Sequence, residues 1–304
     1  MTDSITRVGT EMQSYYGRPI LKEPVWQPEI PTYFFTGGIA GGCSLLHGFA
    51  RLTGQQRLAR TALYVGTAAE LVSPALLVSD LGRPERFLNM FRVFKVTSPM
   101  SVGSWILGVS GGATATAALL EALGKLKAVK ATAEVVSFLT GPPLVTYTGT
   151  LLAQTSIPVW HEARHELPLL FGASAAGSAG AATTMFLPPE EAGPARRFAV
   201  GGAVSALTLM EVMHRRLGFV GEVYEKDASG TLARVSKVCT SAGAGLLALR
   251  GRRSRAAAIT GSALILGGEL AMRWSVFRAG FQSARDPRYT VIPQRERKAE
   301  RAAG

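Results

Sequence analysis

Several ionisable side chains fall inside long apolar stretches of this 304-residue chain. Glu70, Glu211, Glu269 and Arg273 each interrupt such a stretch, and His47 lies near the end of another. Charged groups at bilayer depth are costly, and those found there commonly serve proton or ion transfer. The residues that could do chemistry therefore predict a proton path over His47, Glu70, Glu211, Glu269 and Arg273.

Two interpretations of these residues stay open. Glu70 either relays protons or has a buried structural role, and as a relay it would work together with His47. Glu269 and Arg273 are four residues apart, so on a helix they share one face and are able to neutralise each other.

A second group of polar and aromatic residues stands at or near the ends of the same stretches. Because consecutive membrane helices run in opposite directions, the ends that carry these residues meet on one membrane face, here called side A. The residues are Tyr33, Asp80, Ser104, Trp105, Tyr147 and Thr148. A carboxyl, a phenol and aromatic rings gathered at one face predict a functional site there.

Simpler roles compete with that site. Asp80 could pair with Arg83 and Arg86 to end a helix and fix the following turn. Tyr147 and Trp105 could be interfacial residues, because tyrosine and tryptophan are enriched where a membrane meets water.

The elements that must position these residues follow from the distribution of charge. Hydrophobic residues make up 47% of the chain and charged residues only 18%, against about a quarter in soluble proteins. Residues 30–50, 96–120, 135–161 and 167–189 contain no Asp, Glu, Lys or Arg, and about 20 apolar residues suffice for a membrane helix. Four weaker segments bring the prediction to eight spans, at 61–79, 198–213, 235–249 and 256–277.

The sequence therefore predicts an all-α, multi-pass membrane protein of eight helices. Phe35, Ala40 and Gly41 recur 136 residues later as Phe171, Ala176 and Gly177, which favours two four-helix bundles. The predicted parts are an extended N-terminal segment at 1–31, a membrane domain at 32–278 and a basic C-terminal tail at 279–304. The opposite face, side B, has short loops rich in Lys and Arg, which favours a cytoplasmic side B.

Some classes of function are excluded or disfavoured by composition. The two cysteines, Cys43 and Cys239, are too few to hold an iron–sulfur cluster. No phosphate loop, dinucleotide fingerprint or metal-ligand cluster is found. The net charge of +12 is explained by loops and a tail, so no nucleic-acid partner is expected. The first 29 residues lack the apolar core of a signal peptide.

Five short motifs in order carry a family resemblance. Residues 80–87 read DLGRPERF, residues 98–105 read SPMSVGSW, and YTG at 147–149 is followed by IPVW at 157–160 and LPLLF at 167–171. Over about residues 33–186 the chain resembles the NrfD/polysulfide reductase membrane-subunit family, the PsrC-like proteins.

The resemblance implies a haem-free, eight-helix subunit in the cell membrane that exchanges electrons with menaquinone or ubiquinone. It implies as partners a four-cluster ferredoxin-like iron–sulfur subunit and a molybdopterin-type catalytic subunit, of the formate dehydrogenase or polysulfide/thiosulfate reductase type. The chain would then be the quinone-reactive subunit of an oxidoreductase complex. Whether the complex also translocates protons stays open at this point.

The family motifs carry over to specific residues. Tyr147 is the predicted hydrogen-bond partner of a quinone carbonyl, and Asp80 is the predicted proton carrier. Tyr33, Arg83, Ser104, Trp105 and Thr148 are the predicted quinone-binding residues. The family's polysulfide-reductase members also use an amide side chain in the first span, and none occurs at 33–51, so a second carbonyl partner is not identified.

The tails predict a docking role. Aromatic and proline residues in the first 31 positions and arginines in the last 27 all emerge on side A, where they would hold the iron–sulfur partner. The alternative is that the basic tail binds anionic lipid headgroups.

Two rival functions are considered. A haem-bearing cytochrome b-type subunit needs histidine ligands inside the bundle, yet of the four histidines only His47 lies well within a span. A small transporter or proton channel would explain the buried acids and glycine-rich helices, and would function without redox partners.

Overall fold

Eight long helices make up most of the protein in a computed structural model that describes residues 19–81 and 83–303. They are α1 (Glu29–Leu52), α2 (Gln56–Asp80), α3 (Pro99–Leu123), α4 (Lys127–Ala153), α6 (Leu167–Phe186), α7 (Gly193–Leu217), α8 (Asp227–Arg250) and α9 (Arg255–Arg285). Shorter helices are η1 (Pro84–Phe91), α5 (Pro158–Glu162), η2 (Gly218–Tyr224) and α10 (Arg288–Ala303). No strand occurs within the described ranges.

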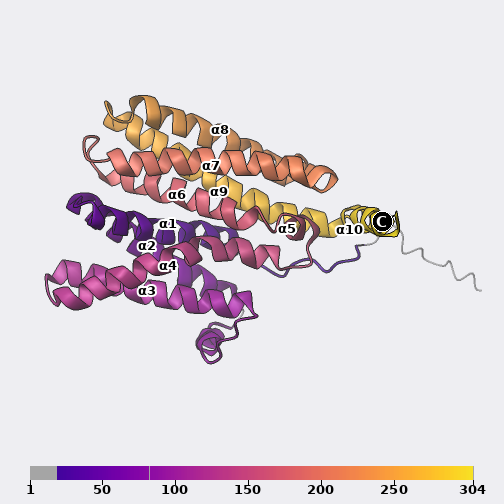
Figure 1. The fold of residues 1–304 in the computed structure, drawn as a ribbon, viewed down its shortest axis with the longest axis horizontal. Helices are drawn as coiled ribbons and strands as arrows, with labels where there is room; N and C mark the ends of the chain where they lie inside the picture. Colours follow the sequence, from indigo (N-terminus) through magenta and orange to yellow (C-terminus); the bar gives the residue numbers. More distant parts are fainter. Residues whose placement is uncertain (1–18, 82, 304) are drawn as a thin grey trace, which may run out of the picture.

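The long helices form two groups of four. Helices α1 to α4 pack together in one group and α6 to α9 in the other, with α6 and α9 lying against α1 where the groups meet (Figure 1). The predicted all-α fold and its division into two bundles are confirmed.

Five of the long helices are long and apolar enough to cross a membrane: α2, α3, α4, α6 and α8. Charged side chains interrupt α7 and α9, including Glu211 in α7 and both Glu269 and Arg273 in α9. The total of eight spans stays a prediction.

Small residues let the helices approach closely. A Cβ atom on Gly202 of α7 would lie 2.2 Å from the backbone nitrogen of Gly177 in α6. A Cβ atom on Gly42 of α1 would lie 2.6 Å from the carbonyl oxygen of Ala175. Side chains of any size would push these backbones apart, so the glycines set how closely α6 packs on α7 within the second bundle and on α1 of the first bundle.

Helix ends follow local sequence signals. The Ser98 hydroxyl accepts a hydrogen bond from the Ser101 backbone N–H at the start of α3, and Ser254 does the same for Ala257 in α9. Gly124, with φ of 65°, terminates α3 in the left-handed conformation that glycine tolerates.

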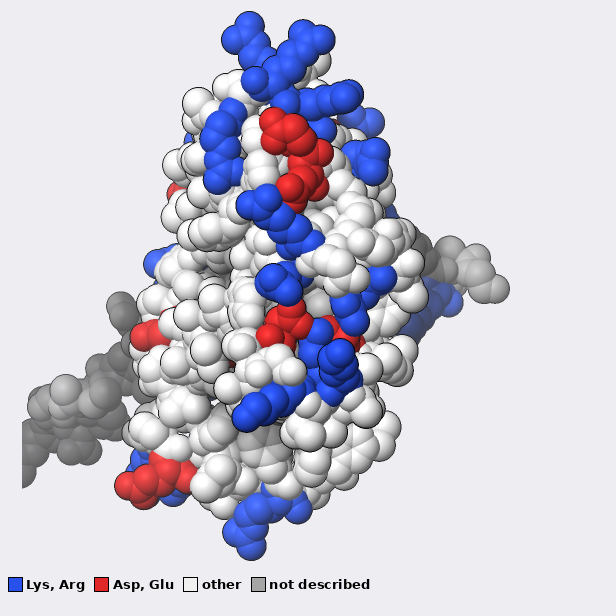
Figure 2. Space-filling view, turned by 90° about the vertical axis from the view of Figure 1, so that its left-hand side faces the viewer, with Lys and Arg blue, Asp and Glu red and all other residues white. Residues whose placement is uncertain are grey.

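The two ends of the molecule differ in character. Short loops join α1 to α2, α3 to α4, α6 to α7 and α8 to α9 at side B, whereas η1, α5, η2 and α10 lie at side A (Figure 1). Lys and Arg crowd the side-B end (Figure 2). The side-B cations are Arg51, Arg57, Arg60, Lys125, Lys127, Lys130, Arg196, Arg197, Arg250, Arg252, Arg253 and Arg255.

Both tails pack on side A. Trp26 stacks on Trp160, with ring centroids 5.6 Å apart, and Trp160 is fully buried with its indole N–H donating to the Val276 carbonyl oxygen at 2.7 Å. Trp160 is thus a core residue of the second bundle's side-A end. Residues 1–18 of the predicted extended segment lie outside the described residues. The predicted tail begins within α9, which runs to Arg285, and continues into α10.

Candidate functional site

A cavity of about 350 Å³ lies between α2, α3 and η1. It is called the α2/α3 cleft here. Its lining is mainly apolar and includes Glu70 of the predicted proton path and Ser104 of the predicted quinone site. The lining residues are Thr67, Glu70, Leu71, Pro74, Leu77, Phe87, Phe91, Ser104, Leu107, Gly108, Gly111, Gly112 and Ala115. Small-molecule sites are commonly of this size and character.

Glu70 supplies the carboxyl group of the cleft. Its side chain is 4% exposed, and its Oε1 atom has no hydrogen-bond partner in the part of the chain that the structure describes. It faces Gly111 of α3, where an added Cβ atom would lie 3.2 Å from Oε1. A buried carboxyl without a partner is costly, so this group is available to a ligand.

Aromatic rings close the side-A end of the cleft. Phe87 and Phe91 of η1 meet edge to face with centroids 5.5 Å apart, and Phe91 in turn meets Trp105 at 5.7 Å. Phe91 reaches the cleft because Gly108 has no side chain, since a Cβ atom there would lie 2.7 Å from Cε1 of Phe91. The buried indole N–H of Trp105 has no acceptor among the described residues.

Ser104 lies in the wall of the cleft but uses its hydroxyl locally. It donates to the carbonyl oxygens of Met100 and Ser101, each at 3.0 Å. As a ligand contact it therefore offers a lone pair and not a proton.

Asp80 ends α2 at side A. Its Oδ1 atom accepts a hydrogen bond from the Gln27 backbone N–H at 3.0 Å. Arg83 and Arg86 are exposed and share a shallow depression with Asp80, but no ion pair joins them within the ranges described. The interfacial ion pair considered for Asp80 is therefore not formed. Gly82 of the same motif lies outside the described residues.

Tyr147 lies on the other side of α3 from η1. Its ring packs directly on Gly103, where an added Cβ atom would lie 2.2 Å from Cε2 of the tyrosine. Thr148 is buried beside it in α4, and Tyr33 of α1 is buried with its hydroxyl unpartnered among the described residues. No described hydrogen bond joins Asp80 to Tyr147, so the predicted residues are spread around the side-A end of the first bundle.

A network of charged residues surrounds His47 at side B. The imidazole Nδ1 lies 2.8 Å from the Ala59 carbonyl oxygen, and Nε2 lies 3.3 Å from Oε1 of Glu134. Lys130 also contacts Glu134, at 3.4 Å. Because the carbonyl oxygen is only an acceptor, Nδ1 carries a proton and Nε2 faces the carboxyl group of Glu134.

A row of hydroxyl groups leads from this network into the bundle. Ser44 of α1 and Ser137 of α4 are 2.9 Å apart, and Ser137 and Thr114 of α3 are 2.8 Å apart. Ser110 lies one turn from Thr114 on the same helix, and its hydroxyl has no hydrogen-bond partner among the described residues. All four hydroxyls are buried. The row thus points from His47 towards the α2/α3 cleft.

The remaining residues of the predicted proton path lie in the second bundle. Glu269 is 1% exposed and borders a cavity of about 310 Å³ between α7, α8 and η2. Arg273 donates to the Phe171 carbonyl oxygen at 2.9 Å and covers the Phe171 ring, and no ion pair with Glu269 occurs among the described residues. Glu211 is 42% exposed and pairs with Arg215 and Lys237. The expected Glu269–Arg273 pair is therefore not formed, and Glu211 lies at the surface.

Sequence reasoning missed Glu134 and Phe91. Glu134 stands at the start of a charge-free stretch, where an acid commonly marks a helix end. Nothing in its spacing from His47 indicates that the two side chains lie next to each other. Phe91 lies in a polar segment between two spans. The one available signal was that Phe87 and Phe91 are four residues apart in the segment before the SPMSVGSW motif. On a helix this spacing places both rings on one face, as an aromatic wall requires.

A family comparison decides the classification. The model of the polysulphide reductase NrfD family matches residues 20–189, which is more than half of the chain. The chain belongs to the NrfD family.

The family match covers the whole α2/α3 cleft and the hydroxyl row. NrfD-family proteins are membrane subunits of quinone-interacting oxidoreductase complexes, and they typically pair with iron–sulfur and molybdopterin subunits. This NrfD-family chain is accordingly a membrane protein with several apolar helices. No curated protein matches it.

Proposed function

We propose that this chain is the quinone-reactive subunit of a multi-subunit oxidoreductase in the cell membrane. It passes electrons between menaquinone or ubiquinone in the bilayer and a four-cluster ferredoxin-like iron–sulfur subunit at side A. The terminal substrate reacts on a third chain of the molybdopterin class. Cys43 and Cys239 lie in different bundles, which supports placing the clusters on the partner.

We place the quinone ring in the α2/α3 cleft. The observation that carries this proposal is a mainly apolar cavity of about 350 Å³ containing the buried, unpartnered carboxyl of Glu70. A bound quinone supplies the redox chemistry by taking up two electrons and two protons. Glu70 in its protonated form donates to one quinone oxygen, and Trp105 supports the aromatic wall of the cleft by packing against Phe91. Phe87 and Phe91 hold the ring between them and α3.

The other predicted residues have supporting roles in this proposal. Asp80 exchanges protons with water at side A, because it ends the helix that carries Glu70 and is itself partly exposed. Tyr147 and Thr148 lie behind Gly103 and position the wall that contains Ser104. Arg83 supplies positive charge at the entrance, and the buried Tyr33 hydroxyl is a second phenol in the first bundle.

We propose further that protons reach Glu70 from side B. His47 and Glu134, whose Nε2 and Oε1 atoms lie 3.3 Å apart without a hydrogen bond, are the proton-carrying groups at the side-B end. The hydroxyls of Ser44, Ser137, Thr114 and Ser110 carry the proton inward, since each hydroxyl both donates and accepts. Glu269, Arg273 and Glu211 have no described hydrogen bond to this row. Glu269 and Glu211 line one cavity of the second bundle, which is a separate candidate for proton exchange, and Arg273 links α9 to α6.

The environment of His47, the histidine inside the first bundle, favours a subunit without haem. Both ring nitrogens of His47 face protein groups, Ala59 and Glu134. A transporter without redox partners would not account for the family match.

Filling the cleft tests the quinone site. Gly112 lines the cleft, is exposed at the helix surface, and would place an added Cβ atom in open space. Gly112→Leu should therefore fold normally and occupy part of the cavity. Losing apolar contact equal to one leucine side chain costs about 1.5–3 kcal/mol, so quinone affinity should fall about 10- to 100-fold.

The measurement is quinone-analogue binding to the purified complex, followed by titration of quinol-linked turnover. Gly201→Leu is the matched control, because Gly201 of α7 is also an exposed helical glycine with nothing within 4 Å of an added Cβ atom. Equal quinone affinity in both variants would refute the cleft as the site.

A further inference from the structure

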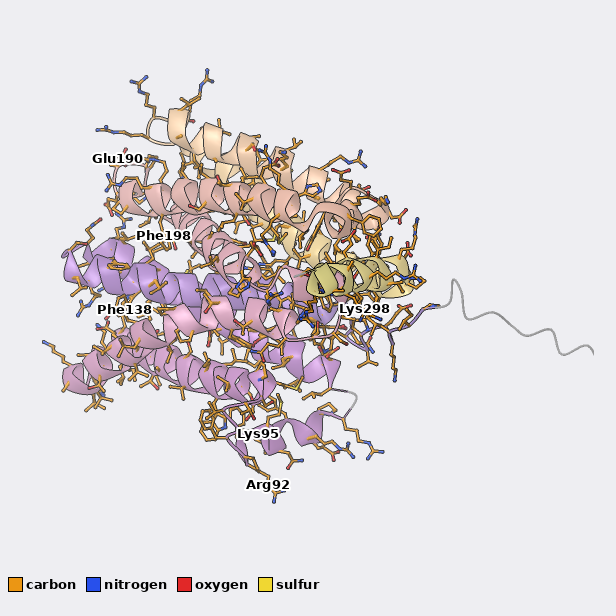
Figure 3. All side chains as sticks on the ribbon, turned by 45° about the vertical axis from the view of Figure 1, so that its right-hand side comes forward. Arg92, Lys95, Phe138, Glu190, Phe198 and Lys298 are labelled. Atoms are coloured by element: carbon orange, nitrogen blue, oxygen red, sulfur yellow. The ribbon has the colours of Figure 1, made fainter. Side chains whose placement is uncertain are left out.

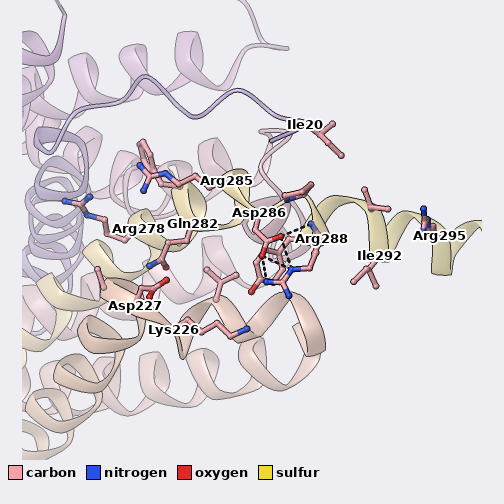
Figure 4. Close-up of a pocket in the computed structure, with 16 residues that line it drawn as sticks. Ile20, Lys226, Asp227, Arg278, Gln282, Arg285, Asp286, Arg288, Ile292 and Arg295 are labelled. Carbon is pink, nitrogen blue, oxygen red and sulfur yellow. Dashed lines mark hydrogen bonds and ion pairs between the residues drawn. The ribbon is translucent and has the colours of Figure 1, made fainter. Parts of the chain in front are cut away.

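A cavity of about 1100 Å³ lies at side A of the second bundle (Figure 4). It is bounded by the end of α9, the start of α8, η2 and α10, and Ile20 of the N-terminal segment contributes to its rim. It is called the tail cavity here. It lies in a different bundle from the α2/α3 cleft, and no residue lines both.

Positive charge predominates around the tail cavity. Five cations line it, against the two acids Asp227 and Asp286. The cations are Lys226, Arg278, Arg285, Arg288 and Arg295.

Three of the cations are neutralised within the protein. Arg285 pairs with Glu23 at 2.9 Å, Arg288 pairs with Asp286 at 2.6 Å, and Lys226 pairs with Glu222 at 2.6 Å. The Arg288 guanidinium holds the pKa of Asp286 below its ordinary value by hydrogen bonding, so Asp286 is charged at neutral pH.

Arg278 and Arg295 remain without an ion pair in the ranges that the structure describes. Arg278 lies over the Trp274 ring, 5.7 Å from its centroid. Figure 4 shows Arg278 and Arg295 at opposite ends of the cavity. An elongated ligand with negative charge would satisfy both.

The tail cavity lies at the depth in the membrane where lipid headgroups are found. Helix α9 begins at Arg255 on side B, and about 20 residues cross the hydrocarbon core, so Arg278 comes just beyond the core at a rise of about 1.5 Å per residue. Trp274, one turn earlier, is in the position of an interfacial tryptophan.

The rest of the lining suits a lipid. Val223, Phe281 and Ile292 give the cavity an apolar surface. The Gln282 side-chain oxygen is buried and has no donor among the described residues, so it is free to accept a hydrogen bond from a hydroxyl group.

We propose that the tail cavity binds an anionic phospholipid whose headgroup carries hydroxyl groups, of the phosphatidylglycerol class. Arg278 contacts the phosphate, Arg295 adds positive charge at the far end of the cavity, Gln282 accepts from a headgroup hydroxyl, and the apolar residues contact the glycerol and upper acyl chains. Basic pockets beside membrane helices bind anionic lipids in this way. An acidic segment of a protein partner would match the charge but not the apolar lining at headgroup depth.

Native mass spectrometry of the purified full chain tests the proposal. The chain is equilibrated with an equimolar mixture of phosphatidylglycerol and phosphatidylcholine, and retained lipid is counted. One phosphatidylglycerol should be retained in preference to phosphatidylcholine. Each arginine near a membrane surface contributes about fivefold to the binding of an anionic lipid, so Arg278→Gln with Arg295→Gln should lower retention about 25-fold.

Two further variants make the result specific. Arg278→Lys with Arg295→Lys keeps the charge and should retain most of the lipid. Arg92→Gln with Lys95→Gln removes two exposed side-A cations far from the tail cavity (Figure 3) and should leave retention unchanged.

Other outcomes would overturn the proposal. Unchanged phosphatidylglycerol retention in the double glutamine variant would do so, as would equal retention of phosphatidylcholine by the unaltered chain. If the double glutamine variant keeps its lipid but loses a copurifying protein, the cavity belongs to that partner instead.

Discussion

The contact between Gly103 and Tyr147 allows a quantitative test of how α3 and α4 position the site. A Cβ atom on Gly103 would lie 2.2, 2.6 and 3.0 Å from Cε2, Cδ2 and Cζ of the tyrosine ring. Ordinary contacts of this kind are at least 3.4 Å. In Gly103→Ala the ring or one helix must therefore move by more than about 1 Å, and interior overpacking costs about 1–3 kcal/mol.

The same substitution gains helix propensity. Replacing a helical glycine by alanine stabilises by about 0.5–1 kcal/mol. The net expectation for Gly103→Ala is a loss of about 1–2 kcal/mol, which for a chain of this size lowers the melting temperature by a few degrees. Because the wall that holds Ser104 moves with Gly103, quinol-linked turnover should fall as well.

Gly112→Ala is the matched control on the same helix, since its Cβ atom meets nothing within 4 Å. It should be as stable as the unaltered chain or slightly more stable. Thermal unfolding of the purified full chain, followed by tryptophan fluorescence, measures both variants.

A double-mutant cycle isolates the contact. Tyr147→Leu removes the ring atoms that collide with the new methyl group, so Gly103→Ala should cost at least about 1 kcal/mol less in that background. The reasoning is refuted if Gly103→Ala is as stable as Gly112→Ala, or if the two substitutions are additive.

Two further predictions concern the hydroxyl row and the N-terminal segment. Ser137→Ala should slow proton uptake from side B during quinone reduction by about tenfold or more in proteoliposomes, as expected when a positioned proton carrier is lost. Thr140→Ala is the control, because the Thr140 hydroxyl donates only to backbone carbonyl oxygens of the same helix, and it should leave the rate of proton uptake unchanged. Equal rates of proton uptake in the two variants would remove the hydroxyl row from the proton path. Arg285 lowers the pKa of Glu23 below its ordinary value of 4.5 by hydrogen bonding, so the pair stabilises the N-terminal segment above about pH 4.5 and is lost as pH falls through the folded pKa. The fluorescence of Trp26, stacked on Trp160, should report that release on acidification, and Arg285→Gln should abolish the pH dependence.

The sequence predicted the helical bundles because the charge-free stretches, together with the thickness of a bilayer, limit where membrane helices can begin and end. Helical rise also placed Glu70 and Ser104 at defined depths, and both line the α2/α3 cleft; their roles stay predictions. Charged residues in α7 and α9 were harder to place, because Glu211 and Glu269 look alike in sequence although one is at the surface and the other is 1% exposed.

Contacts between helices explain what was missed. The pairing of His47 with Glu134 joins residues 87 positions apart, and no spacing rule connects them. The aromatic wall depends on where η1 folds back over α3, which is permitted by the absence of a side chain at Gly108. Such contacts depend on tertiary packing and not on periodicity.

The exposure of Gly112 means that the α2/α3 cleft opens sideways, at the surface that faces lipid. A quinone entering there diffuses in two dimensions and never has to leave the bilayer. Its effective concentration is then the number of quinones per lipid, and a Michaelis constant quoted per volume of buffer would change with the amount of membrane in the assay. Kinetic comparisons between variants of this chain should therefore be made at a fixed ratio of quinone to phospholipid.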